Sequence, residues 1–273
     1  MIEFRDVTFS YPSSKGPREP VFDRFNLRIA SGRYVALMGP NGSGKSTLGK
    51  IAKGLLTPNC GQVWVGGRLL PPGEISSHVG YVFSNPENQI VSSVVEEDVA
   101  FGLENMGMDP AEIDRRVGES LRLVEMEAYR QHSPHLLSGG QQQKIVLAGT
   151  LALDSQILVL DEPTSMLDLK DRGEILDLFQ KIHERGKKTL LHITHSFDEA
   201  LRSQDFIYLE RGQVAYSGSA EGFLSSDAAI DPSIMLPSIW RVVQGLRDRG
   251  HDIPPEVRSL QELKEFLLRP PGA

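Results

Sequence analysis

The sequence of 273 residues contains very little cysteine and has no excess of basic charge. Cys60 is the only cysteine, which excludes an internal disulfide framework and a site built from several thiolates. We expect a reducing compartment, and we expect Cys60 to be an inert packing residue. The 29 Lys+Arg against 36 Asp+Glu give a formal net charge of −7. Such a balance offers no extended basic surface, so we expect no nucleic-acid partner.

Long apolar runs are also missing. The longest stretch without Asp, Glu, Lys or Arg lies between Lys53 and Arg68, and it contains a proline and several glycines. A helix that crosses a bilayer needs about 20 predominantly apolar residues. The segment from Met1 to Asp6 lacks the basic start and apolar core of a signal peptide. We therefore expect a cytoplasmic protein that lies on the inner face of the cell membrane only through a partner.

The remaining composition, 40% hydrophobic and 24% charged, is that of a globular protein. Strand patterns fill residues 1–38, and short apolar runs follow at 157–160 and 190–193. Helical patterns lie between the runs, at about 46–54, 94–105, 109–127, 139–153 and 170–185. Alternation of this kind predicts an α/β fold with a mostly parallel core sheet. We place a main domain at 1–225, with a helical subdomain at about 84–152, and a small α-helical appendage at 226–273.

The clearest motif is a G-x-x-x-x-G-K-[ST] loop between a predicted strand and a predicted helix. It consists of Gly39, Pro40, Asn41, Gly42, Ser43, Gly44, Lys45, Ser46 and Thr47. Glycines allow backbone N–H groups to turn inward around phosphate oxygens, and the helix that follows presents its positive end. Lys45 would reach the β- and γ-phosphates of a nucleotide, and Ser46 would ligate Mg²⁺. The motif predicts a P-loop NTPase.

Two carboxylates follow the apolar run 157–160. Asp161 is expected to hold Mg²⁺, directly or through water, as the acidic residue of a P-loop NTPase does. Glu162 is then expected to orient or deprotonate the attacking water. Acidic residues at the end of a strand are common where a helix starts, and alone they do not indicate a function. They become a specific sign of an NTPase here because the chain also contains the phosphate loop.

The pentapeptide Leu137-Ser-Gly-Gly-Gln141 lies at the start of a predicted helix. Alone, Ser138 would be read as an ordinary N-cap. Together with the phosphate loop and Asp161-Glu162, in this order, the pentapeptide resembles the ATP-binding cassette family over about residues 1–220. The resemblance implies an antiparallel β subdomain beside the parallel sheet and an ATPase that uses Mg²⁺.

Further roles are implied by the resemblance alone. Tyr11 lies where the family places an aromatic ring against adenine, and His195 corresponds to a histidine that contacts the γ-phosphate. The family forms head-to-tail dimers, in which the pentapeptide of one subunit meets the ATP of the other. The resemblance therefore implies that these residues contact the partner's ATP: Ser138, Gly139, Gly140, Gln141 and Asp168. Whether the dimer is a homodimer or a heterodimer with a related ATPase stays open.

Two segments resemble one group within the family, the ATPases of energy-coupling factor transporters. The segments are 84–105 and the stretch from Leu236 to Pro255. The group drives import of vitamins and of transition-metal ions, so the resemblance implies two partners, an integral membrane transporter protein and a substrate-binding membrane subunit. It also implies that the region after residue 84 forms a groove for a helix of the membrane protein. Apolar residues that suit such a groove are Ile90, Val91, Val94, Val95 and Val99.

Other functions remain as alternatives. The chain could be the ATPase of an importer that uses a soluble binding protein. A non-transport cassette ATPase is a further alternative, but the interval between Gly44 and Ser138 leaves no room for the long coiled coil of chromosome-type members. Translation-type members carry two cassettes in a chain, and this chain has one. A P-loop kinase would leave residues 137–141 unexplained.

One position departs from the family. After the strand at 79–83, cassette ATPases place a glutamine that reaches Mg²⁺ and couples closure to the membrane partner, and this chain has Ser84 there. A serine hydroxyl is too short for that contact without a bridging water. Either Asn85, Gln89 or a water substitutes, or the site is slow or poorly coupled.

Overall fold

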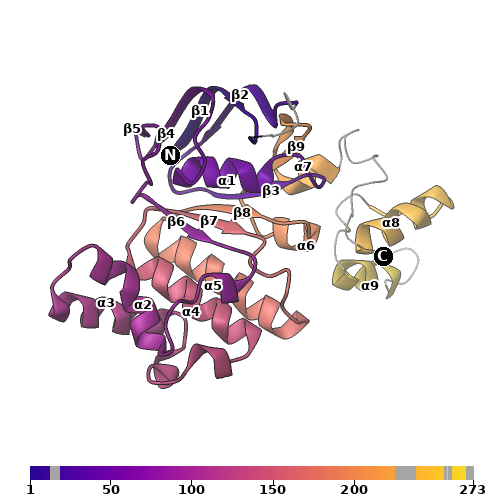
Figure 1. Cartoon of the computed structure of the whole chain (residues 1–273). Coiled ribbons are helices and arrows are strands. Elements are labelled where there is room, and N and C mark those ends of the chain that lie inside the picture. Colours follow the sequence, from indigo (N-terminus) through magenta and orange to yellow (C-terminus); the bar gives the residue numbers. More distant parts are fainter. Residues whose placement is uncertain (13–18, 225–237, 255–256, 258–259, 269–273) are drawn as a thin grey trace.

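The computed structural model describes residues 1–12, 19–224, 238–254, 257 and 260–268. An antiparallel sheet contains the N-terminal strands (Figure 1). Its strands, in the spatial order β2-β1-β4-β5, are β2 (Phe22–Ile29), β1 (Ile2–Phe9), β4 (Cys60–Val65) and β5 (Arg68–Leu69). Alternate residues of β1 are buried on either side of a bulge between Phe4 and Val7, as expected for a sheet with one covered face. The antiparallel β subdomain is thereby confirmed.

A second sheet of mostly parallel strands lies below the first in Figure 1. In the spatial order β10-β9-β3-β8-β7-β6, its strands are β10 (Gln213–Gly218), β9 (Asp205–Glu210), β3 (Tyr34–Met38), β8 (Thr189–Ile193), β7 (Ile157–Asp161) and β6 (Val79–Val82). Only β10 runs antiparallel to its neighbour. Strands β3, β6, β7 and β8 are buried at every residue, which explains their continuous apolar runs. The predicted fold class is confirmed.

Helices cover both faces of the second sheet. Helix α1 (Lys45–Lys53) lies between the two sheets, and its Leu48, Ile51 and Ala52 join one core with both of them. The opposite face carries α2 (Val95–Asn105), α3 (Pro110–Leu123), α4 (Gly139–Ala152) and α5 (Leu169–Gly186). The short helices α6 (Phe197–Ala200) and α7 (Ala220–Leu224) pack beside β3 and β9. Single 3-10 turns occur at Pro86–Asn88, Glu127–Tyr129 and Pro134–Leu136.

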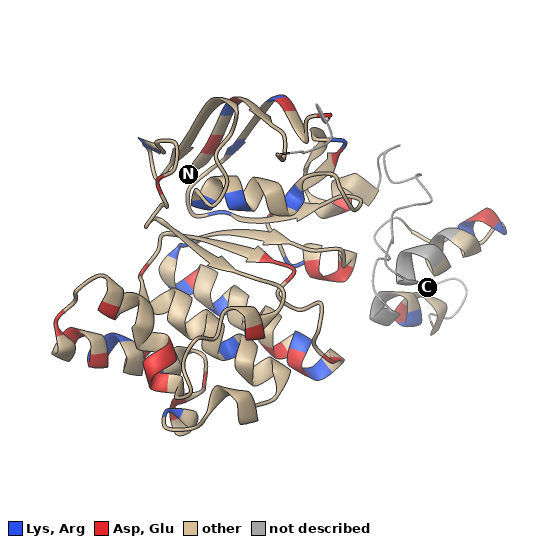
Figure 2. Ribbon diagram, viewed as in Figure 1, with Lys and Arg blue, Asp and Glu red and all other residues tan. Residues whose placement is uncertain are grey.

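Helix α3 differs from the expected range. The sequence pattern placed its end near Glu127, but the helix ends at Leu123. Glu125 adopts a φ of 61°, which no right-handed helix accommodates. Along α3, Lys/Arg and Asp/Glu stand close together (Figure 2), and Arg115 forms ion pairs with Glu112 and Glu119. Because both partners are exposed to water, these pairs contribute little to the stability of α3.

In the C-terminal part, the described residues form two helices, α8 (Ser238–Asp248) and α9 (Leu260–Leu268). Val243, Ile253, Val257 and Leu263 form a small buried cluster of their own. The expected boundary between 225 and 226 lies outside the described residues. We propose, from this separate cluster, that the cassette core ends near α7.

Removal of residues 229–273 is expected to leave a folded core that binds nucleotide. Phe223 of α7 is fully buried, and its ring lies 4.9 Å from that of Phe206, so α7 belongs to the core. Thermal unfolding and nucleotide titration of residues 1–228 check this. As a control, Phe223→Ala in the same truncation should lose about 3–5 kcal/mol of stability. A folded truncation without any nucleotide affinity would contradict the boundary.

Candidate nucleotide site

The loops that carry the predicted motifs meet at one edge of the parallel sheet. Strands β3, β8 and β7 are parallel neighbours, so their carboxyl ends lie side by side. The phosphate loop follows β3, Asp161 ends β7, and His195 follows β8. In open α/β sheets ligands bind outside these carboxyl ends. The strand order alone therefore places the phosphate loop, Asp161 and His195 at the same edge of the sheet.

The phosphate loop has the backbone geometry of an anion cradle. Gly39 and Gly44 have φ values of 150° and 107°, and a Cβ atom at Gly39 would lie only 2.0 Å from the Leu209 carbonyl oxygen. Helix α1 begins without a side-chain cap, and its first turn holds no acid. Its first N–H groups are thus open to a phosphate. Within the described part of the chain, the buried Ser43 Oγ also has no hydrogen-bond partner.

Lys45 occupies the interior of the loop. Its Nζ donates to the carbonyl oxygens of Gly39 at 2.9 Å and Pro40 at 3.1 Å. Burial lowers the pKa of the Lys45 ammonium, and the carboxylates of Glu162 and Asp161 oppose this shift. The ammonium therefore already lies inside the cradle, where a phosphate oxygen could replace a backbone carbonyl as its acceptor.

The two residues expected to hold a metal ion are in direct contact. Ser46 Oγ donates to Asp161 Oδ1 at 2.8 Å. The other carboxylate oxygen, Oδ2, accepts a 2.6 Å hydrogen bond from the Tyr81 hydroxyl. Burial raises the pKa of Tyr81 far above its ordinary value, and the charge of Asp161 adds to the effect. Sequence reasoning missed Tyr81, although its place near the end of a neighbouring strand was a usable signal.

Glu162 and His195 are paired. Glu162 Oε1 lies 2.6 Å from His195 Nε2, and both side chains remain partly exposed. The backbone of Glu162 has a φ of 52°, which a non-glycine residue rarely adopts. Strain of this kind is concentrated at functional sites. The structure thus brings together the two side chains that the sequence assigned to catalysis.

Tyr11 contacts the far end of the same loop. Its hydroxyl lies 2.9 Å from Thr47 Oγ1, and its ring packs edge-on against Phe9 with 5.0 Å between centroids. The side chain is 38% exposed, so one ring surface stays accessible. This arrangement suits the stacking role that the family resemblance implies.

The pentapeptide 137–141 forms a complete capping box at the start of α4. Ser138 Oγ accepts from the Gln141 N–H at 3.3 Å, and Gln141 Oε1 accepts from the Ser138 N–H at 3.0 Å. Ser138 and Gly139 are exposed, and a Cβ atom on Gly139 would meet nothing closer than 3.8 Å. Gly140, in contrast, has Asp171 Oδ2 at 2.2 Å from such an atom. No polar contact among the described residues joins this box to the phosphate loop.

Exposed apolar side chains lie near Asp168, the other residue that is expected to contact the ATP of a partner subunit. Asp168 caps α5 by accepting from the Asp171 N–H at 2.8 Å. Nearby, Met166 is 66% exposed and Leu169 is 86% exposed, as is Leu136 next to the pentapeptide. Apolar side chains of this size are unusual on a free surface when they gather around polar motifs.

The departure at Ser84 is not repaired by the amides that follow it. Gln89 accepts from the Phe83 N–H at 3.1 Å and donates to the Tyr81 carbonyl at 3.0 Å. Asn85 accepts from the Glu87 N–H at 3.0 Å, which caps the 3-10 turn. Both amides thus bond to nearby backbone, and no hydrogen bond to Asp161 from either is found among the described residues.

A groove of about 320 Å³ lies between the sheet and the helical part. Its wall includes Tyr81 and Phe83 from one side and Val91, Phe101 and Leu153 from the other. Val99 also lines it, as the sequence suggested. Ile90 and Val95, which were also expected in a groove, do not line this one and are buried in the core cluster.

A buried carboxylate that the sequence did not single out connects the surrounding loops. Glu199 is 3% exposed and accepts hydrogen bonds from the Thr164 and Thr194 hydroxyls, each at 2.7 Å. Its Oε2 also lies 3.3 Å from His192 Nε2. Burial alone would raise the pKa of Glu199, but His192 and the two hydroxyls outweigh it and lower the pKa to about 2.

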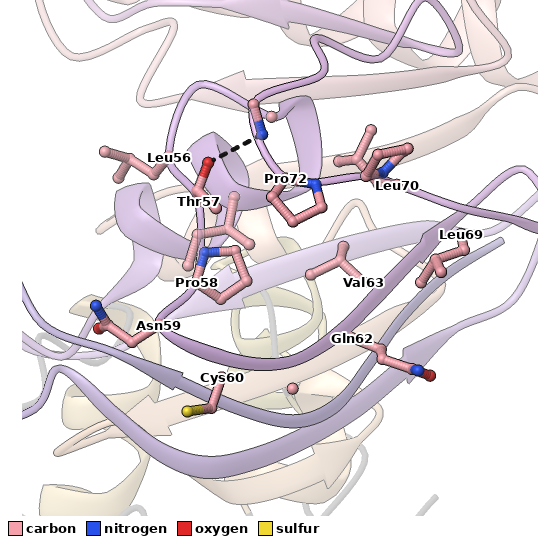
Figure 3. A pocket seen from close by; sticks show the side chains of 15 residues that line it. Leu56, Thr57, Pro58, Asn59, Cys60, Gln62, Val63, Leu69, Leu70 and Pro72 are labelled. Atoms are coloured by element: carbon pink, nitrogen blue, oxygen red, sulfur yellow. Dashed lines mark hydrogen bonds between the residues drawn. The ribbon is translucent and has the colours of Figure 1, made fainter.

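A separate pocket lies away from these motifs, between α1 and the antiparallel sheet (Figure 3). It has a volume of about 200 Å³ and is mainly apolar, with Leu56, Val63 and Leu70 in its wall. Cys60 stands at its rim and is exposed, so the expectation of a packing role is wrong. Cys60 is the first residue of β4, and the first three residues of this strand are exposed.

Comparison with known proteins agrees with this geometry. Residues 22–165 match the ABC transporter family. An energy-coupling factor transporter ATP-binding protein, EcfA1 of Clostridium perfringens, is 37% identical over 98% of both chains. The EcfA1 protein of Symbiobacterium thermophilum is 42% identical over 93% of this chain and 90% of its own.

Solved structures show the same likeness. CbiO1 of Clostridium perfringens, described as part of the ABC transporter complex CbiONQ, has a TM-score of 0.74 at 28% identity, with 89% of this chain and 98% of that chain covered. The ATP-binding cassette MJ0796, solved as a dimer bound to ADP and Pi, has a TM-score of 0.71 at 30% identity and covers 81% and 99%. The chain belongs to the ABC transporter family and is an ATPase. It is similar over nearly its whole length to the EcfA ATP-binding proteins.

Glu162→Gln is expected to retain ATP binding and to lose hydrolysis by a factor of about 10²–10⁴, because a neutral amide cannot accept the proton of the attacking water. Nucleotide titration and phosphate release measure the two properties separately. Lys45→Ala is the matched contrast, since loss of the buried ammonium should weaken nucleotide binding itself. Hydrolysis at the wild-type rate in Glu162→Gln would show that another residue serves as the base.

Proposed function

We propose that the chain is the ATP-hydrolysing subunit of an energy-coupling factor importer for vitamins or transition-metal ions. The observation that carries the ATP-hydrolysing part of the proposal is the contact between Ser46 and Asp161 beside the uncapped start of α1. The similarity to EcfA proteins over 98% of the chain supports the transporter class. Location on the inner face of the cell membrane is part of the same proposal. No helix in the described residues has the length and apolar character needed to cross a bilayer.

The donor set at the loop fits Mg²⁺ bound with ATP. A hydroxyl and a carboxylate are hard oxygen ligands, and Mg²⁺ is usually held by one or two such groups together with substrate phosphates. Bound there, the ion would neutralise charge on the β- and γ-phosphates. Ser46 and Asp161 would hold it, while Lys45 and the N–H groups of the loop would bind the phosphate oxygens.

The catalytic step would use the pair at the edge of the loop. Glu162 would accept a proton from the attacking water at Oε1, the atom that now faces His195 Nε2. His195 would then donate from Nε2 toward the γ-phosphate, as the family resemblance implies. Since the two side chains bond each other at 2.6 Å, they must separate before either acts. Closure around ATP would supply that separation.

A pair of subunits would complete each site. The Ser138 hydroxyl accepts one hydrogen bond within its capping box, and its own proton remains available to a phosphate oxygen. Exposed Gly139 lets a partner's nucleotide approach the start of α4. Burial of Leu136, Met166 and Leu169 at the contact would stabilise the pair. The partner subunit is either a second copy or a related ATPase.

The groove beside α2 and α4 is the proposed binding site for the integral membrane protein. It is apolar in its interior, with Phe101 48% exposed and Val91 61% exposed at its rim. An amphipathic helix would bury both side chains. The substrate-binding membrane subunit would then attach through that protein, without contact to ATP.

Co-purification tests the transport class. The full chain, carrying an affinity tag and expressed in its own host, should bring down an integral membrane protein in mild detergent. Phe101→Asp should abolish the capture and leave ATP binding unchanged, because a charge would occupy the apolar groove. Capture of a membrane transporter that works with a soluble binding protein would favour the conventional importer. Capture of ribosomes or DNA would favour a non-transport ATPase.

Gly139→Asp is expected to block closure of the pair. The new side chain has room on its own subunit, but its carboxylate would face the partner's γ-phosphate and repel it. The variant is made in the Glu162→Gln background, and ATP-dependent dimerisation is measured by size-exclusion chromatography. Dimerisation should be lost, and the nucleotide affinity of the monomer should be unchanged. Gly139→Ser is the uncharged control. An equal loss of monomer affinity would contradict the two-subunit site.

Ser84→Gln should raise ATP turnover in the assembled transporter. Gln89 is bonded to the backbone at Phe83 and Tyr81, which supports the slow or poorly coupled site over substitution by that amide. Gln89→Ala should accordingly change turnover little. Unchanged turnover in Ser84→Gln, together with a loss in Gln89→Ala or Asn85→Ala, would contradict this proposal.

A further inference from the structure

Tyr81 is the only tyrosine among the described residues whose hydroxyl donates to Asp161. It lies in β6, next to β7, and is 5% exposed. Its O–H bond to Asp161 Oδ2 measures 2.6 Å, and Ser46 holds Oδ1 at 2.8 Å. With one donor on each oxygen, the plane of the carboxylate is fixed, and neither oxygen can rotate into the place of the other.

The position of the ring is itself fixed by packing. The Tyr81 ring lies against Phe83, with 4.6 Å between centroids. On the other side, a Cβ atom on Gly49 of α1 would come within 3.2 Å of the Tyr81 ring. The ring therefore fills the space between β6 and α1, and its hydroxyl has little freedom to leave Asp161. A hydrogen bond held by packing in this way loses little entropy when it forms.

Because the carboxylate of Asp161 is an acceptor only, the hydroxyl must donate to it. Donation stabilises the negative charge and keeps Oδ2 turned toward Tyr81. Oδ1 then stays beside Ser46, where the metal ion is proposed to lie. Partners of a metal-holding carboxylate typically contribute 10–100-fold to metal affinity.

We infer that Tyr81 is a positioning residue that orients Asp161 for the metal ion of the nucleotide complex. The inference rests on the proposed Mg²⁺ site, and it adds a role that neither Ser84 nor the amides after it perform. The same ring lines the groove proposed for the membrane protein. Tyr81 thus connects the floor of that groove with the metal-holding carboxylate through a single side chain.

The test measures binding of Mn²⁺, as a probe for Mg²⁺, to the full chain saturated with a non-hydrolysable ATP analogue. Free Mn²⁺ is followed by electron paramagnetic resonance, so no turnover is needed. Tyr81→Phe, which removes only the hydroxyl, should weaken Mn²⁺ affinity of the complex by about 10–100-fold. Affinity for the analogue in the presence of a chelator should remain unchanged, because the phosphate loop is intact.

Tyr34→Phe is the matched control. Tyr34 is 1% exposed, and its hydroxyl bonds His192 Nδ1 at 3.1 Å, so the variant also deletes one buried hydroxyl. It should leave Mn²⁺ affinity unchanged. If Tyr81→Phe does not accumulate as folded protein, Tyr81→Met removes the same hydroxyl with an adaptable apolar side chain and should give the same loss.

Four results would contradict part of the argument. Unchanged Mn²⁺ affinity in the Tyr81 variants, or an equal loss in Tyr34→Phe, would overturn the role of Tyr81. A loss of metal-free nucleotide affinity as large as the loss of Mn²⁺ affinity would also overturn it, since the effect would then be structural. Absence of a Mn²⁺ site in the wild-type complex would instead contradict the proposed metal site.

Discussion

Parallel pairing of β3, β8, β7 and β6 is the constraint on which the site depends. Since these strands point the same way, everything that follows them emerges at one edge. The phosphate loop, Asp161 and His195 come from segments far apart in the sequence, and the register of two strand pairs, β3–β8 and β7–β8, sets their spacing. A slip of one residue at β7 would turn Asp161 to the other face of the sheet. Burial of every residue in these strands makes such a slip costly.

Hydrogen bonds to Glu199 connect the loops that follow β7 and β8. Glu199 bonds Thr164, which begins the loop leading to Asp168, and Thr194, which precedes His195. One buried carboxylate thus joins the end of β7 to the end of β8. Loss of its partners would leave an uncompensated buried charge, which is strongly destabilising. The two loops are therefore expected to keep a fixed relation while Glu162 and His195 rearrange.

The sequence predicted the parallel sheet, the phosphate loop and the acids after β7 because each depends on local pattern. Apolar runs of four or five residues, a glycine spacing and an adjacent strand or helix are all visible without tertiary contacts. Local pattern did not single out Tyr81 or Glu199, since the importance of each comes from contacts with other strands and loops. For Tyr81, only its place near the end of a strand was a signal. Ile90 and Val95, which were expected in a groove, lie in the core and do not line the groove described here, because apolar character alone does not tell a core side chain from one that lines a groove. The sequence pattern placed the end of α3 too late, because the helix is ended by the positive φ of Glu125, which the residue types do not reveal.

Helix α4 touches both surfaces on which the protein is proposed to act. Its first residues form the exposed capping box at Ser138, and its later turns contribute Val146 and Thr150 to the groove. Fourteen residues of regular helix span about 21 Å without a proline or a break. A rigid rod transmits displacement at one end to the other with no loss to bending. In the proposed assembly, one continuous helix would therefore join the partner's nucleotide to the membrane protein, and a tilt of α4 at Ser138 would also move the residues that line the groove.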